Sequence, residues 1–138
     1  MTALGYVFDQ TVLTGYAQGS LSIASLIVHL DERSVRIAVP MLAHSASAAQ
    51  LNEQQRDELD SVITNVDMVE VSPLSYLTDS NELADILAAT GSIDYPAAHT
   101  IAVANHLGLE IVTLDRARWE DVENALPWSL ELVELRDD

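Results

Sequence analysis

The chain has 138 residues, 49% of them hydrophobic, and its 22 acids against six bases give a formal net charge of −16. This length suits one well-filled core, so we expect a single domain over residues 1–138. The strong negative charge disfavours a generic nucleic-acid scaffold, which needs a basic surface, and favours a protein partner with a basic segment. The alternative that the composition reflects the source of the protein, with the acids mostly on a solvated face, stays open. The absence of Cys excludes disulfides and thiolate metal sites.

No apolar run approaches the roughly 20 residues of a membrane-spanning helix. The N-terminus also lacks the basic region and long apolar region of a signal peptide. We therefore expect no membrane association and a cytoplasmic location.

The first half of the chain alternates short apolar runs with helical patterns. Apolar residues at i, i+3, i+4 and i+7 make residues 20–33 an amphipathic helix. Pro40 ends the second apolar run, because proline is tolerated at a strand end and not in a strand interior. The predicted elements are a strand over 4–8, a short helix over 12–16, the helix over 20–33, a strand over 35–39 and a helix over 41–50.

The second half continues this alternation. Asn52 with Gln55, and Asp79 with Glu82, have the spacing of capping boxes, and each pair is expected to open a helix. Gly91 and Gly108 suit the left-handed caps that end helices. The predicted elements are a helix over 52–66, a strand over 68–71, a helix from Asp79 to Gly91, a helix ending at Leu107, a strand over 111–114, a short helix over 119–126 and an edge strand over 130–135.

Strands that alternate with helices predict an α/β fold with a mostly parallel five-stranded sheet and helices on both of its faces. Several chemistries of such folds lack their motifs. The sequence has no GxGxxG or GxxxxGK[ST] phosphate cradle and no GxSxG serine elbow, and a receiver domain would need a lysine that this chain does not have.

Carboxylates follow two of the predicted buried strands. Asp9 comes directly after the first, and Asp115 ends the apolar run Ile111, Val112, Leu114. Open α/β sheets bind their ligands at the carboxyl ends of parallel strands. The two acids are therefore candidate site residues. Aspartates at strand ends also commonly accept hydrogen bonds from loop amides without binding anything, and this alternative stays open.

The segments YVFDQT, IVTLD and AVANHLGLEIVTLD resemble the PIN domain of VapC-type toxins, in length and element order over nearly the whole chain. The resemblance implies a three-layer α/β/α sandwich and a metal-dependent endoribonuclease, with an antitoxin as partner and often a homodimer. In such enzymes carboxylates hold Mg²⁺ or Mn²⁺, which prefer oxygen ligands, activate a water and stabilise the charge of attack on phosphate.

Two of the family's positions match well. Asp9 is the first acid, supported by the hydroxyl of Thr11. Asp115 is the acid after the fourth strand, with Thr113 two residues before it. The resemblance assigns both aspartates as catalytic metal ligands.

The other two positions differ. The family's glutamate falls near Ala46, and the next acid is Glu53, so this ligand is lost. The remaining aspartate falls on Ala97, one turn after Asp94. Asp94 is then either the N-cap of the following helix, which Pro96 supports, or a displaced third catalytic and metal ligand.

The histidines and tryptophans leave further alternatives. His44 and His99 either join the carboxylates, which would favour Mn²⁺ or Zn²⁺, or make ordinary hydrogen bonds. Trp119 and Trp128 are expected to pack at a sheet edge, because no aromatic and basic residues interleave as in single-strand binding proteins.

Two functions follow. One is a Mg²⁺- or Mn²⁺-dependent endoribonuclease of the toxin kind, which binds RNA. The other is a PIN-derived module whose catalysis is weak or absent and which is retained for protein–protein interaction. The lost glutamate, the displaced aspartate and the net charge favour the second. The two intact acids, Asp9 and Asp115, favour the first.

Overall fold

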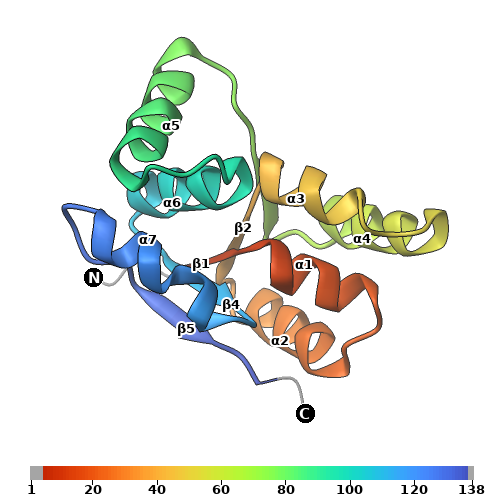
Figure 1. The fold of residues 1–138 in the computed structure, drawn as a ribbon. Helices are drawn as coiled ribbons and strands as arrows, with labels where there is room; N and C mark the ends of the chain where they lie inside the picture. The colour runs from red at the N-terminus through yellow and green to blue at the C-terminus, as the bar shows by residue number, and fades with distance from the viewer. Residues whose placement is uncertain (1–4, 137–138) are drawn as a thin grey trace.

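A computed structural model describes residues 5–136. One parallel sheet in the order β3-β2-β1-β4-β5 runs through the centre (Figure 1). The five-stranded sheet that the sequence predicts is confirmed, and all four strand pairs are parallel. The strands are β1 (Gly5–Phe8), β2 (Arg36–Pro40), β3 (Val69–Ser72), β4 (Glu110–Thr113) and β5 (Leu132–Glu134).

Helices cover both faces of this sheet, so the expected α/β/α sandwich is also confirmed (Figure 1). Successive residues of a strand point to opposite faces. In β1, Val7 packs in the cluster that contains residues of α5 and α6, and Phe8 packs in the cluster of α1 and α2. The helices are α1 (Gln10–Ala17), α2 (Leu21–Glu32), α3 (Met41–Ala48), α4 (Glu53–Asn65), α5 (Leu77–Thr90), α6 (Tyr95–Leu107) and α7 (Glu120–Ala125), with a 3₁₀ turn, η1 (Arg116–Trp119), before α7.

The predicted order of strands and helices is confirmed, and most boundaries lie within a few residues. Residue 4, the expected first residue of the first strand, lies outside the described residues. The capping box of Asn52 and Gln55 is present, because each side chain accepts a hydrogen bond from the other's backbone amide, at 3.1 and 2.8 Å.

The predicted start of α5 is wrong. The helix begins at Leu77, and Asp79 lies inside its first turn instead of before it. Asp79 Oδ2 accepts hydrogen bonds from the amides of Ser75 and Tyr76, at 3.0 and 3.1 Å. Asp79 therefore plays the third-position role of a capping box, for which the sequence had suggested Glu82.

Because every strand pair is parallel, the carboxyl ends of the strands lie at one edge of the sheet. The chain leaves β1 at Asp9 and β4 just before Leu114. No single helix within residues 5–136 is long and apolar enough to cross a membrane. Helices α1 and α2 have the required length and composition only when taken together, and the chain bends by 108° between them.

Candidate functional site

Asp9 is fully buried at the carboxyl end of β1, where it is the N-cap of α1. Its Oδ1 accepts three hydrogen bonds: from the Thr11 amide at 2.9 Å, the Thr11 hydroxyl at 2.6 Å and the Val12 amide at 3.2 Å. These bonds satisfy free amides of the first helical turn. The expected support of Asp9 by Thr11 is therefore a direct contact.

The second oxygen of Asp9 faces the segment after β4. The indole Nε1 of Trp119 donates to Asp9 Oδ2 at 3.1 Å and also approaches the Thr113 hydroxyl at 3.3 Å. The Thr113 hydroxyl in turn lies 3.3 Å from that of Thr11. Asp9, Thr11, Thr113 and Trp119 thus form one hydrogen-bond network, in which the indole of Trp119 links the segment after β4 to the end of β1.

Asp94 is the N-cap of α6 and is partly exposed. Its Oδ1 accepts from the Ala97 amide at 3.1 Å, and Pro96 stands in the first turn, as the capping interpretation expects. Its Oδ2 lies 3.2 Å from the Arg118 guanidinium. Asp94 therefore both caps the helix and faces the site.

Asp115 is exposed at the end of β4. Its Oδ1 accepts a long hydrogen bond, 3.4 Å, from the amide of Arg118 and so caps η1. Its own amide donates to the Thr113 hydroxyl at 3.1 Å. The residue whose backbone amide bonds Asp115, Arg118, also carries the guanidinium that contacts Asp94 and Asp9.

Arg118 is the residue that all three acids share. One terminal nitrogen lies 3.2 Å from Asp94 Oδ2, the other lies 4.0 Å from Asp9 Oδ2, and the backbone amide bonds Asp115. The guanidinium carbon also lies 5.6 Å from the centre of the Trp119 ring, within the range of a cation–π contact. A cation from the chain itself therefore lies between the carboxylates of Asp94 and Asp9.

The positions at which the family would place its other two acids hold alanines. Ala46 lies on α3, and Glu53 is the first residue of α4, exposed in its first turn. Ala97 is buried in the first turn of α6, with its amide on Asp94.

The two histidines that were considered as ligands have other partners. His44 Nε2 lies 2.7 Å from Asp60 Oδ1 of α4. His99 is buried, and its Nδ1 accepts from the Leu42 amide at 3.2 Å. Pro40, the N-cap of α3, offers no side-chain acceptor, so His99 serves the first turn of α3 from a neighbouring helix. Burial lowers the pKa of His99, and the charge of Asp79 opposes this shift.

The arrangement can be tested for its fit to a divalent cation. Three hydrogen bonds occupy Asp9 Oδ1, and Asp9 Oδ2 accepts one from Trp119 and lies 4.0 Å from the Arg118 guanidinium, so the remaining lone pair of Oδ2 already faces a cation. Asp94 accepts from the Ala97 amide and pairs with the Arg118 guanidinium, although its side chain is 41% exposed, and Asp115 is exposed as well. Within residues 5–136 no three His, Asp or Glu side chains are grouped so as to hold a metal ion. The residues in this arrangement do not fit Mg²⁺ or Mn²⁺.

Sequence reasoning missed Arg118 and identified Trp119 only as a packing residue. Trp119 is buried at 1% exposure and donates to the candidate carboxylate. One signal was present: both residues follow Asp115 within four positions. A one-turn helix directly after Asp115 places the side chains of Arg118 and Trp119 next to the end of the strand.

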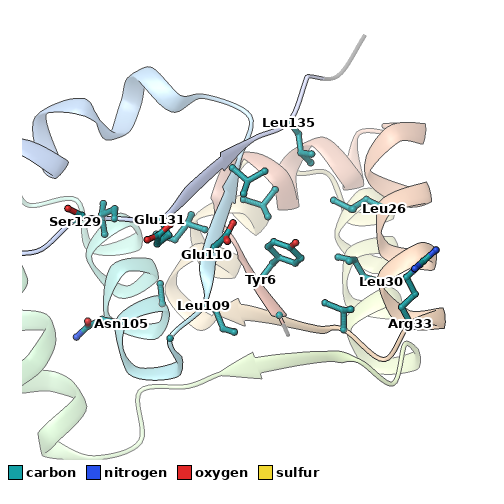
Figure 2. A pocket seen from close by; sticks show the side chains of 18 of the residues that line it. Tyr6, Leu26, Leu30, Arg33, Asn105, Leu109, Glu110, Ser129, Glu131 and Leu135 are labelled. Carbon is teal, nitrogen blue, oxygen red and sulfur yellow. The ribbon is translucent and has the colours of Figure 1, made fainter. Parts of the chain in front are cut away.

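A hollow of about 810 Å³ lies elsewhere, at the amino-terminal ends of β1 and β4. Figure 2 shows Leu26 and Leu30 of α2 directed toward Tyr6 of β1 across this hollow. The hollow lies at the opposite edge of the sheet from the acids. Its lining residues Gly5 and Glu110 begin strands β1 and β4, whereas Asp9 and Asp115 follow the ends of these strands.

The chain's likeness to solved structures shows its fold. One similar structure is a chain in the crystal structure of VapBC2 from Rickettsia felis bound to a DNA fragment from the promoter of these proteins. The match covers 96% of the present chain and 100% of the VapBC2 chain, with a TM-score of 0.66 and 15% sequence identity. No protein-family model and no curated protein matches the sequence. The chain has a PIN-like fold.

Proposed function

We propose that this chain is a PIN-derived protein of the toxin–antitoxin kind that binds a protein partner and has lost metal-dependent RNA cleavage. The observation that carries the proposal is the guanidinium of Arg118 between Asp94 and Asp9. In the nucleases that the sequence resembles, a divalent cation neutralises such carboxylates. In this chain an arginine supplies positive charge at that place.

The donor set supports the same conclusion. Asp9 is buried with four hydrogen bonds, and Ala46 stands where a glutamate ligand is expected. A net charge of −16 also leaves little basic surface to hold RNA. It favours a partner with a basic segment, and the VapBC2 likeness is consistent with an antitoxin in that role.

A second candidate function has one observation in its favour. Asp9 and Asp94 contact the Arg118 guanidinium and Asp115 contacts the Arg118 backbone amide, so all three acids lie about one residue at the carboxyl edge of the sheet. If the Arg118 side chain, which is 22% exposed, turned outward, Asp9 and Asp94 would lose their cation beside the exposed Asp115, with Thr11 in support of Asp9. The chain would then be a Mg²⁺- or Mn²⁺-dependent endoribonuclease with RNA as its substrate.

Calorimetric titration of Mn²⁺ separates the two functions. The wild type is compared with Asp115→Asn, which removes one charge and keeps an oxygen for the Arg118 amide. Loss of catalysis predicts the same weak, non-saturating curve for both proteins, because so acidic a surface binds divalent ions loosely. A stoichiometric site present only in the wild type would support the nuclease and contradict the proposal.

Arg118→Gln tests the role of the guanidinium, with Arg36→Gln as its matched control. Arg36 also pairs with a carboxylate, Glu70 at 3.0 Å, and its loss changes the net charge equally. We expect Arg118→Gln to bind Mn²⁺ at least about tenfold more tightly than the control, since only this variant leaves converging acids without a cation. Equal binding would show that Arg118 does not occupy the place of an ion.

Two further measurements complete the test. RNA incubated with the wild type in millimolar Mn²⁺ should remain intact; cleavage that Asp115→Asn abolishes would contradict the proposal. A protein partner crosslinked in cells of the source and identified by mass spectrometry should be captured equally by the wild type and by Asp115→Asn. Loss of the partner from the variant would tie binding to the acids.

A further inference from the structure

The hollow of about 810 Å³ at the amino-terminal ends of β1 and β4, which we call the amino-edge groove, lies on the face of the sheet that α1 and α2 cover. Its floor is apolar and comes from three neighbouring strands, through Tyr6, Val112 and Val133. Its wall is the inner side of α2, from which Leu26 and Leu30 point toward Tyr6 (Figure 2). Tyr6, Leu26 and Val133 are only half-buried. The packing of α2 therefore leaves part of this face uncovered.

Tyr6 and two glutamates form a row across the floor of the groove. Tyr6 is the register partner of Glu110 on the neighbouring strand β4. The Ile111 amide donates to the Glu131 carbonyl oxygen at 2.8 Å, so Glu131 lies beside Glu110 at the entry to β5. Each glutamate stands two residues before a valine of the floor, so both side chains point to the same face. Figure 2 shows Tyr6, Glu110 and Glu131 in this order across the groove.

The two glutamates have no cation of the chain beside them. Glu110 and Glu131 are exposed, and no salt bridge joins either of them to a base among residues 5–136. Like charges at neighbouring positions of adjacent strands repel each other and destabilise a sheet. A cation bound beside both carboxylates would remove this repulsion. The row therefore favours a positively charged group in the groove.

The opposite wall of the groove carries the opposite charge. Arg33, directly after α2, lines the groove beyond Leu30, and Figure 2 shows it on the far side from Glu110 and Glu131. A bound cation is thus attracted to one end of the groove and repelled from the other. Between the two ends the groove offers the apolar side chains of its floor and of α2. The groove therefore suits a molecule with a cationic end and an apolar body.

We infer that the amino-edge groove binds a small organic amine, with its ammonium group at Glu110 and Glu131 and its apolar body over Tyr6 toward Leu26. The ring of Tyr6 adds a cation–π attraction for the ammonium group. A volume of about 810 Å³ falls within the roughly 300–1,000 Å³ of small-molecule sites. The net charge of −16 also raises the local concentration of organic cations. This inference goes beyond the proposed function.

Other exposed apolar residues and hollows fit such a molecule less well. Leu77 and Ile93 are 83% and 89% exposed, but they lie at opposite ends of α5, whose 14 residues span about 20 Å. A small molecule on either residue would stay largely in water. A hollow of about 500 Å³ between β3, α5 and α6 contains Glu70 and Asp79, which already hold an arginine and two backbone amides. Only the amino-edge groove combines an apolar floor with a pair of acids that lack such partners.

Calorimetric titration of phenethylamine into the full chain at about 150 mM NaCl tests the inference, since this salt screens loose attraction to the surface. We expect one saturable site per chain, with a Kd of about 1 mM or below. The control ligand is 2-phenylethanol, which has the same ring and chain length without the charge. It should bind at least about tenfold more weakly, because it gains no attraction from the glutamates.

A double variant, Glu110→Gln with Glu131→Gln, should weaken the binding of phenethylamine at least about tenfold. The matched control is Glu58→Gln with Glu120→Gln, which removes the same charge from exposed residues of α4 and α7 and should bind as the wild type does. Tyr6→Leu keeps an apolar floor and removes the ring, so it should weaken binding about threefold or more. Circular dichroism confirms that each variant is folded.

Three results would overturn the inference: no saturation of the wild type at about 10 mM phenethylamine, equal binding of 2-phenylethanol, or equal binding by the two double variants. The last result would show general attraction to an acidic surface. Asp115→Asn separates this site from the carboxyl edge of the sheet and should bind phenethylamine as the wild type does. Loss of binding in Asp115→Asn would place the amine at the other acids and contradict the inference, whereas the proposed function does not depend on amine binding.

Discussion

The indole of Trp119 donates a hydrogen bond to Asp9 Oδ2 at 3.1 Å, across 110 positions of the sequence. It joins the segment after β4 to the carboxylate that caps α1 after β1. Both side chains are buried, with exposures of 1% and 0%. A hydrogen bond between two buried side chains has a larger effect on stability than one exposed to water.

Trp119→Phe should lower the free energy of unfolding by about 2 kcal/mol, because a buried bond to a charged acceptor is lost while most of the ring volume is kept. Urea denaturation measures this change. Trp128→Phe is the control: Trp128 is 36% exposed, and its variant should lie within about 0.5 kcal/mol of the wild type. Equal effects of the two variants would mean that the Asp9 bond contributes nothing to stability.

Asp9→Asn should also be destabilising, by about 1–3 kcal/mol. Asn can keep an oxygen on the Thr11 and Val12 amides, but its NH₂ group then faces the indole N–H, so two donors oppose each other. A carboxylate held among repelling acids for a metal ion would give the opposite sign, since removing its charge relieves repulsion. The sign of the change in the free energy of unfolding therefore distinguishes a structural carboxylate from a metal ligand.

A double-mutant cycle connects these two predictions. If the Asp9–Trp119 bond is the cause, Asp9→Asn together with Trp119→Phe should cost less than the sum of the single changes, by at least about 0.5 kcal/mol. Asp115→Asn is the control, because Asp115 is exposed and should not couple to Trp119→Phe. Additive effects at Asp9 and Trp119 would contradict a direct interaction.

Much of the fold follows from local patterns. The runs Val7–Phe8 and Ile111–Val112 alternate between the two helical layers, and the period of α2 is visible in Ile23, Ile27 and Leu30. Helix starts are less determined. Asp79 fits the first or the third position of a capping box equally well by residue type, and only the backbone at Ser75 and Tyr76, which bonds it, decides between them.

The candidate site was predicted only in part, for a similar reason. Asp9, Asp115 and the cap at Asp94 could be placed from strand ends and from Pro96, because these are local features. The approach of Arg118 to Asp94 depends on how η1 turns after β4 and on where α6 begins. Two segments 24 positions apart must be packed before that contact exists, and no local pattern specifies it.

Gly5→Ala should destabilise the protein by about 1–3 kcal/mol. A Cβ at this position would lie 2.9 Å from the backbone carbonyl oxygen of Arg36 on the neighbouring strand, which cannot move without disturbing the β1–β2 pairing. Gly15→Ala is the comparison, since its Cβ would meet the terminal methyl groups of Ile23 and Leu114, at 2.8 and 2.9 Å.

These methyl groups belong to flexible side chains, and alanine is favoured over glycine within a helix by about 1 kcal/mol. Gly15→Ala should therefore cost less than Gly5→Ala in thermal or urea unfolding. The reverse order would show that the packing of α1 on α2 and β4 is the tighter constraint.

Stability should fall as the pH is lowered through the range below 6.5, owing to His99. Burial lowers the pKa of His99 below its usual 6.5 in the folded state, so the unfolded chain binds the proton first. The contribution of neutral His99 is thus complete above about 6.5, the unfolded pKa, and is lost as the pH falls toward the folded pKa. Protonation of Nδ1 would also remove the acceptor of the Leu42 amide.

Urea unfolding between about pH 5 and pH 8 measures this dependence, which spans the ordinary pKa of histidine. His99→Asn places an uncharged oxygen near the position of Nδ1, so the part of the pH dependence due to His99 should disappear. His106→Gln, which removes an exposed histidine from the same helix, is the comparison. If His106→Gln flattened the curve and His99→Asn did not, the titrating group would lie on the surface, and the capping of α3 by His99 would be independent of pH.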